Sequence, residues 1–213
     1  MEVRVSPTRM QLLRTRKRLA VAVRGHKLLK DKRDELMKKF LALVRRNKEL
    51  REEVEEKLGK AFKSFLMARA VMPPEVIEEA IMYPKRVLEF DATSVNILSV
   101  KVPKFSWAEK GEAQESEIYP YGPAATASEL DFAIGSLAEV LPKMIELAEV
   151  EKSVELLSAE IEKTRRRVNA LEYVLIPQLE ETARYITMKL DEMERGNLTR
   201  LMKVKEIVRE RGA

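Results

Sequence analysis

Side chains that could do chemistry are few in this chain, and their spacing builds no catalytic site. The sequence has 213 residues, no cysteine and a single histidine, His26. Disulfides and thiolate metal sites are therefore excluded, and one imidazole cannot build a histidine-based metal site. No G-x-x-x-x-G-K-[ST] loop is present to cradle a phosphate. The sequence predicts no catalytic, cofactor-binding or metal-binding residues, no cofactor, and a chain that is not itself an enzyme.

The acidic runs have a simpler interpretation than acid–base catalysis. Glu52, Glu53, Glu55 and Glu56 crowd one stretch, and Glu180 and Glu181 another. Basic residues three or four positions away would pair with them on a solvated helix face. These runs indicate exposed helix surface.

Basic residues gather in two places that could meet an anionic partner. One is the cluster Arg14-Thr15-Arg16-Lys17-Arg18, and the other is Arg165-Arg166-Arg167. Lysine and arginine neutralise phosphates, so nucleic acid is one hypothesis. Interleaved aromatics and a groove-reading motif are missing, which favours an acidic protein partner instead.

Long amphipathic segments must position these residues. Apolar residues recur every three or four positions, which is typical of a coiled coil. The first line is Leu12, Thr15, Leu19, Ala22, His26, Leu29, Arg33, Leu36, Phe40, Leu43, Asn47, Leu50, Val54, Leu58, Ala61, Phe65, Ala68 and Met72. The second is Leu147, Val150, Val154, Leu157, Ile161, Thr164, Val168, Leu171, Leu175, Leu179, Thr182, Ile186, Leu190, Met193, Asn197, Leu201, Val204 and Val208. We call the contact line between the two helices the seam. His26 lies on it and is therefore expected to have a structural role.

The segment bounds divide the chain into three parts. The sequence predicts an N-terminal coiled-coil helix over 6–72, capped by Ser6 ahead of Pro7, and a C-terminal one over 128–208. An insert at 73–127 begins at Pro73-Pro74, which stops the first helix. Pro142 and Pro177 fall inside the second helix and predict bends. The fold class is all-α dominated: a long antiparallel two-helix coiled coil with a small central insert, forming one elongated unit.

The insert predicts a short helix and a β-hairpin. Residues 74–82 suit a short helix, and the alternation near Val95 suits a strand. A polar turn over Glu109–Glu117 would lead to a second short strand at Ile118-Tyr119. Since an isolated hairpin is marginal in water, it should pack on the helices or on a partner.

Several stretches together resemble one known family. They are Ser6-Pro7-Thr8-Arg9-Met10, the run from Arg24 to Arg33 (RGHKLLKDKR), and Arg165 to Glu172 (RRRVNALE) followed by Ile176-Pro177. The chain is similar here to the D subunit of the archaeal and vacuolar-type rotary ATPases, along both helical segments. The insert carries no motif of its own.

The resemblance implies a central-stalk rotor shaft in an A-type or V-type proton- or sodium-translocating ATP synthase. Such a shaft couples rotation of the membrane ring to ATP synthesis or hydrolysis in the catalytic head. It implies the A and B subunits of the head and the F and C subunits of the stalk as partners, with the ring met indirectly. It also implies a peripheral place at the cytoplasmic face of the cell membrane, without membrane insertion and without nucleic acid.

Contact residues are expected where the two basic helix ends would lie together and at the arginine run. They are Leu12, Leu13, Arg14, Arg16, Arg18, Arg165, Arg166, Arg167, Leu201, Met202 and Lys205. Two alternatives remain open at this point: a prefoldin-like coiled-coil chaperone, and a basic nucleic-acid-binding coiled-coil arm. No apolar run is long enough for a signal peptide or a membrane span, which predicts a soluble intracellular chain.

Overall fold

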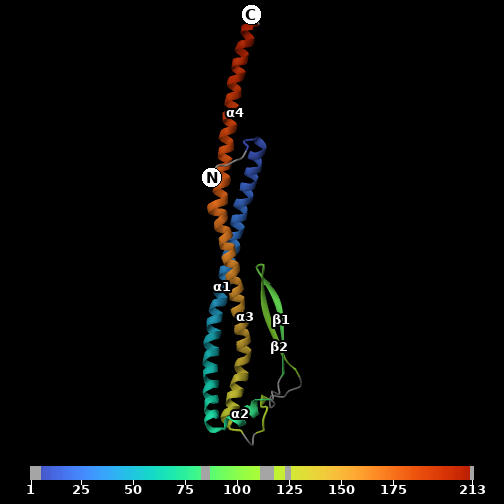
Figure 1. Cartoon of the computed structure of the whole chain (residues 1–213), viewed down its shortest axis with the longest axis vertical. Helices are drawn as coiled ribbons and strands as arrows, with labels where there is room; N and C mark the ends of the chain where they lie inside the picture. Colours follow the sequence, from blue (N-terminus) through green and yellow to red (C-terminus); the bar gives the residue numbers. More distant parts are fainter. Residues whose placement is uncertain (1–5, 83–86, 111–117, 123–125, 212–213) are drawn as a thin grey trace. The chain divides into compact units, whose positions relative to one another are not determined.

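The computed structural model describes residues 6–82, 87–110, 118–122 and 126–211. Its elements are the helices α1 (Arg9–Val71) and α2 (Pro74–Ile81), the strands β1 (Val87–Ile97) and β2 (Val100–Lys110), then α3 (Ser128–Ala170), a π-helical turn η2 (Leu171–Leu175) and α4 (Ile176–Arg211) (Figure 1). The predicted fold class is confirmed: two long helical segments flank an insert with a short helix and an antiparallel hairpin.

The chain forms two units, and the first contains residues 1–34 and 162–213. The helices of this unit run antiparallel, because Arg9 pairs with Glu194 while His26, farther along α1, pairs with the earlier Glu172. The buried line between them consists of Thr15, Ala22, Thr164, Val168 and Ile186.

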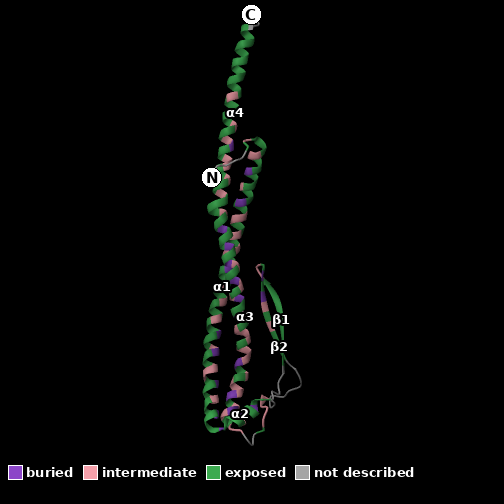
Figure 2. Ribbon diagram, viewed as in Figure 1, coloured by how far each residue is buried: buried purple, intermediate pink, exposed green. Residues whose placement is uncertain are grey.

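The second unit contains residues 35–161, and its helices α1 and α3 are antiparallel as well. Arg46 pairs with Glu146, whereas Glu53 pairs with Lys143. The buried stripe follows the predicted seam along α1, whereas on α3 it begins ahead of the predicted line and includes Ser153 beside the half-buried Val154 (Figure 2). Its members are Leu36, Leu50, Val54, Ala61 and Ala68 from α1 and Leu130, Ala133, Val140, Val150, Ser153, Leu157 and Ile161 from α3. Successive members are separated by three or four residues or by sums of such steps, so they lie on one face of each helix.

Helix ends have local causes. The helix α1 begins two residues later than the Ser6-Pro7 signal indicated, because Thr8 is the cap: its Oγ1 accepts from the backbone N–H of Gln11 at 3.2 Å. Pro73 and Pro74 end α1 at Val71 as expected, and Pro74 then opens α2.

The short helix α2 closes one end of the second unit. Its Ile77 and Ala80 are buried against Ala68 and Met72 of α1 and Leu130 of α3. Phe65 and Tyr121 cover this cluster from its edge. The short helix predicted over residues 74–82 is thereby confirmed.

The hairpin exists, but its predicted turn is wrong. The chain reverses at Leu98-Ser99, where Ile97 pairs with Val100, and the two strands continue in register to Val87 and Lys110. Residues 109–110 thus belong to β2, residues 111–117 of the expected turn lie outside the described residues, and Ile118-Tyr119 is not a strand.

The true turn is hidden in the sequence because it lacks the usual residues. Leu98 and Ser99 have φ of 51° and 74°, a conformation that hairpin turns of two residues require and that glycine or asparagine normally supplies. Leu98 packs against the buried cluster of Leu36, Val100, Leu157 and Ile161. Burial of this side chain offsets the backbone strain, which roughly amounts to 1–2 kcal/mol per residue.

The hairpin is fastened to α3 by its backbone. The N–H of Phe105 donates to Glu149 Oε2 at 2.9 Å, so it points outward from the ladder. Outward and inward N–H groups alternate along an antiparallel strand in steps of two residues. Pro103, two residues earlier, therefore stands where no ladder bond is lost.

The π turn η2 changes the phase of the seam in the first unit. Ile176 donates its N–H to the carbonyl of Leu171, five residues back. Leu175, expected on the seam, is 42% exposed, and Ile176 takes the half-buried position instead. This corrects the predicted seam at Leu175, because the wider turn advances the helix by one residue. Pro142 is accommodated inside α3.

Candidate partner-binding surfaces

The last part of α4 is an exposed apolar and basic surface. Arg9, the first residue of α1, meets Glu194, and α4 continues to Arg211. Among the described residues, no helix of this unit lies opposite the final turns. Leu201 and Met202 are each 65% exposed, and Lys205 is exposed too. A helix that is both apolar and uncovered can bind an enclosing partner.

The start of α1 carries the predicted basic cluster. Arg14, Arg16 and Arg18 are exposed, Leu13 is 58% exposed, and Leu12 is half-buried toward the seam. Charges on neighbouring turns give this end of the helix a positive surface, which would attract an acidic surface.

The two predicted groups are not brought together. Because Arg9 already lies opposite Glu194, residues 12–18 face an earlier part of α4, and Leu201, Met202 and Lys205 lie past the start of α1. The expectation of paired tips is wrong in this respect. It assumes helices of equal reach, whereas α4 extends beyond its partner.

The arginine run lies on the exposed side of α3. Arg165, Arg166 and Arg167 are all exposed, between the buried Thr164 and Val168. Arg166 forms an ion pair with Glu162 one turn earlier. The run therefore adds positive charge to the surface of the first unit.

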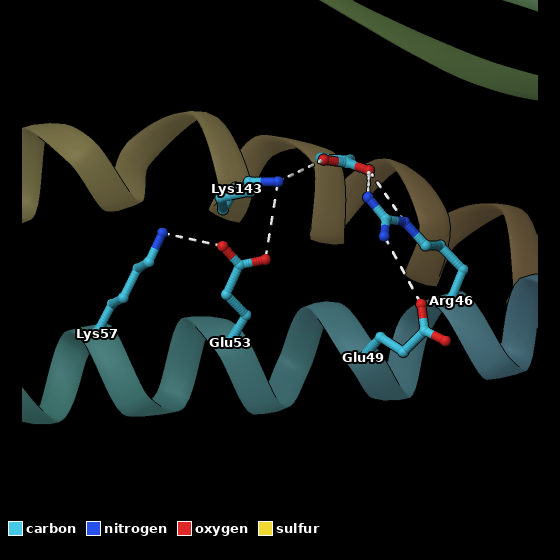
Figure 3. Close-up of polar contacts among 6 residues, drawn as sticks. Arg46, Glu49, Glu53, Lys57 and Lys143 are labelled. Carbon is cyan, nitrogen blue, oxygen red and sulfur yellow. Dashed lines mark hydrogen bonds and ion pairs between the residues drawn. The ribbon is translucent and has the colours of Figure 1, made fainter.

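Charged side chains bridge α1 and α3 in the second unit (Figure 3). Arg46 donates to Glu146 at 2.7 Å, and Glu53 lies between Lys57 at 2.9 Å and Lys143 at 3.7 Å. The hydrogen bond with Glu146 raises the pKa of Arg46. The hydrogen bond with Lys57, and then the charge of Lys143, lower the pKa of Glu53. These pairs are exposed, so they orient the helices more than they stabilise them.

One face of the hairpin carries exposed apolar side chains. Phe90 and Phe105 stack with ring centroids 5.0 Å apart, and their cross-strand neighbours Ala92 and Trp107 share that face. Phe90 is 56% exposed and Trp107 38%. The opposite face buries Val100 and Val102. Sequence reasoning missed this second surface because it misplaced the turn. The available signal was a large apolar residue at every second position: Leu88 and Phe90 on β1, and Pro103, Phe105 and Trp107 on β2.

A hollow of about 490 Å³ lies beside α2. It is lined by Phe65, Arg69, Pro74, Ile77, Glu78, Ile81 and Met82. Nearby, Tyr121 donates to Asp131 at 2.7 Å. Burial is the main cause that raises the pKa of Tyr121, and the bond to Asp131 adds to it. The hollow is apolar with an ionic rim, which suits a side chain of a partner protein.

Two kinds of function have no structural basis in the part of the chain that the structure describes. Its histidine and carboxylate side chains form no group of three or more able to hold a metal ion. None of its helices is apolar over a stretch long enough to cross a bilayer. What the geometry offers is a set of surfaces for proteins.

Comparison with known proteins points to one family. The family described as the D subunit of ATP synthase matches residues 11–206. A V-type ATP synthase D subunit from Acetivibrio thermocellus is 63% identical over 208 residues, covering 98% of this chain and 93% of that protein. One from Clostridium botulinum is 56% identical, covering 99% and 98%, and one from Clostridium novyi is 59% identical, covering 96% and 94%.

Proposed function

Because the chain belongs to the family of ATP synthase D subunits, we propose that it is the central-stalk shaft of a V-type ATP synthase and couples rotation to ATP synthesis or hydrolysis. The observation that carries this function is similarity along nearly the whole chain, both helical segments and the insert included. A member of this family is not itself catalytic. It works within a membrane-associated complex.

The finer partners follow from the surfaces. We propose that the final turns of α4 and the basic start of α1 enter the catalytic head, which the A and B subunits form. Leu12, Leu13, Arg14, Arg16, Arg18, Leu201, Met202 and Lys205 are the proposed contacts there. An uncovered helix end with apolar and basic side chains supports this, since such a surface needs an enclosing partner.

The remaining surfaces are assigned to the stalk. We propose that Arg165, Arg166 and Arg167 face the head or a neighbouring stalk subunit. The insert, with the hollow beside α2, would then meet the F and C subunits of the stalk, and the membrane ring would be reached through them. The complex would place this chain at the cytoplasmic face of the membrane.

The shaft would act through shape. Three chemically identical interfaces in the head would meet different sides of one asymmetric chain, so each would be biased toward a different state. The helices α1 and α4 differ in length, a π turn precedes α4, and α1 carries a basic cluster near its start. None of these features repeats around a threefold axis, which is what such a role requires.

Reconstitution with the catalytic head tests this function. The variants are the full chain, a chain ending at Asn197, and a chain with Arg14, Arg16 and Arg18 changed to glutamate. We expect one full-length chain per head and ATP-driven rotation, slippage or failed assembly without residues 198–213, and weakened assembly after charge reversal. As a matched control, Lys48→Glu changes an exposed lysine of the second unit and should leave head binding unchanged. If none of the chains binds the head, the shaft assignment is wrong.

The two alternatives are not favoured. A prefoldin-like chaperone or a nucleic-acid-binding arm would not be expected to resemble an ATP synthase D subunit over nearly its full length. Steep salt dependence of RNA or DNA binding, together with no binding to the head, would restore the second alternative.

A further inference from the structure

We propose that the π turn Leu171–Leu175 is a compliant joint in the long C-terminal helix. It arises because this helix has one residue more than the regular three- and four-residue spacing of the seam can accommodate. The proposal concerns the first unit alone. Its mechanical part rests on the proposed shaft function, and its structural part does not.

The extra residue is visible in the spacing of half-buried and buried positions. One line of such positions runs through Thr164, Val168 and Leu171 before the turn and through Ile176, Leu179, Ala183, Ile186 and Leu190 after it, with Thr182 and Thr187 half-buried beside it. Every step is three or four residues except that from Leu171 to Ile176, which is five. A π turn accommodates one additional residue, so the positions that follow it point toward α1 again.

The opposite helix has no matching irregularity. In α1 the buried and half-buried positions Thr15, Leu19, Ala22, His26 and Leu29 follow steps of three and four residues throughout. The two sides of the seam therefore differ by one residue. A continuous α-helix would move the later positions, Ile186 among them, off the seam, although Ile186 is fully buried.

Proline supplies a second, separate cause at the same place. Pro177 follows the turn by two residues and has no N–H. In a regular helix its ring would press against the carbonyl of Tyr173, four residues earlier, whereas the wider turn relieves that clash. The turn is thus either required by the seam or imposed by the proline, and the two causes can be separated by substitution.

Little packing holds the turn. Tyr173 is 71% exposed, Val174 52% and Leu175 42%. A polar contact from His26 Nε2 to Glu172 Oε2, at 3.4 Å, ties it to α1. Segments with few buried contacts open at low free energy. If the chain is a shaft, twist applied between its ends would be taken up here before the well-packed seam yields.

Single-residue deletions in the full-length chain test the structural part. Deleting Val174 together with Pro177→Ala makes every seam step three or four, so a regular helix should form. We expect amide hydrogen exchange across residues 172–180 to slow by about tenfold or more, with an unfolding midpoint that is unchanged or higher. The matched control inserts one alanine after Val174 in the Pro177→Ala chain; it should lower the midpoint, because a second extra residue moves Ile186 and Leu190 off the seam.

Pro177→Ala alone separates the two causes. If the seam requires the turn, exchange across residues 172–180 stays fast in this variant. Slow exchange in Pro177→Ala, or equal destabilisation by the Val174 deletion and the alanine insertion, would overturn the phase argument.

Rotation of the assembled head tests the mechanical part. A probe fixed to the stalk should fluctuate through a smaller angle in the Val174-deleted Pro177→Ala chain than in the unsubstituted one. Equal fluctuation despite slowed exchange would mean that the turn does not yield under torque. Failure of the unsubstituted chain to assemble would overturn the shaft function, and the exchange comparison would still decide whether the joint exists.

Discussion

A few buried side chains account for most of the stability, whereas many exposed charged side chains mainly orient the helices. Leu36 is fully buried against Val100, Leu157 and Ile161, so its apolar area is wholly removed from water. Arg46, by contrast, bridges α1 and α3 while its side chain stays 46% exposed. Exposed ion pairs contribute little to stability. Substitutions in the second unit should therefore have effects that follow burial rather than charge.

Leu36→Ala should lower the free energy of unfolding by about 2–5 kcal/mol, because it removes buried contacts and leaves a cavity. Denaturant unfolding followed by circular dichroism measures the change. Leu41→Ala is the control on the same helix, since Leu41 is 50% exposed; it should change the free energy by less than about 0.5 kcal/mol. Similar losses in both variants would contradict the burial pattern.

Tyr121→Phe should destabilise the chain at pH 8 and have a smaller effect at pH 11. Burial and Asp131 raise the pKa of Tyr121 above its ordinary value of 10.0. The folded chain then keeps a proton that the unfolded chain releases, so this stabilisation is complete below pH 10 and declines as pH rises above it. Unfolding midpoints of both chains across this interval give the comparison. A difference independent of pH would show that the folded and unfolded states share one Tyr121 pKa.

At the scale of elements, residues depart from their local backbone preferences where tertiary packing stabilises the fold by more than the departure costs. The hairpin turn uses Leu98 and Ser99 at positive φ, although neither residue type favours it. Leu98 contributes contacts with the Leu36 cluster in compensation. Ser99 is exposed and has no such role. The conformational free-energy cost of positive φ at Ser99 could therefore be removed by substitution.

Ser99→Gly should stabilise the hairpin by up to about 1 kcal/mol, because glycine adopts positive φ without a steric penalty. Ser94→Gly, in the middle of β1, is the matched control and should destabilise it. Amide exchange in β1 and β2 reports on both. Faster exchange in Ser99→Gly than in the unsubstituted chain would contradict the assigned turn.

The whole molecule exposes more apolar surface than its own helices can cover. Leu198, Leu201, Met202, Val204 and Val208 on α4 are each more than half exposed. Phe90, on the hairpin, is exposed to a similar degree. Such a chain is suited to a complex and poorly suited to isolation.

The isolated chain should therefore self-associate, and it should form a one-to-one complex with a small stalk subunit. Removing residues 198–213 should shift the isolated chain toward monomer, since that segment lacks a covering helix among the described residues. Sedimentation velocity at micromolar concentration distinguishes these states. A stable monomer of the full chain would count against the prediction.

The sequence predicted the helices far better than the insert. Seam positions such as Leu36, Leu50 and Ala61 repeat over many turns, so the helical period is clear from the sequence. The hairpin turn was misplaced because tertiary packing of Leu98 overrode turn propensity. The π turn could not be read from the sequence, because successive four-residue steps such as Leu171, Leu175 and Leu179 recur later in the same line, and the exposure of Leu175 required the structure.

The candidate surfaces divide in the same way. Exposure of Arg14 and Arg165 follows from helix periodicity, so it could be predicted. The separation of Leu201 from Leu12 could not, because it depends on the register between two helices distant in sequence. The aromatic face of the hairpin depends on strand register for the same reason.

Pro103 also limits how this protein can aggregate. The outer edge of β2 offers no backbone donor at Pro103, and the next outward donor, on Phe105, is occupied by Glu149. A strand from another molecule would find neither hydrogen bond there. Sheet growth along this part of β2 is thereby disfavoured, and at the β1 edge an incoming copy would bring its own Asp91 close to this one. The middle of β2 is thereby a poor template for fibrous self-assembly.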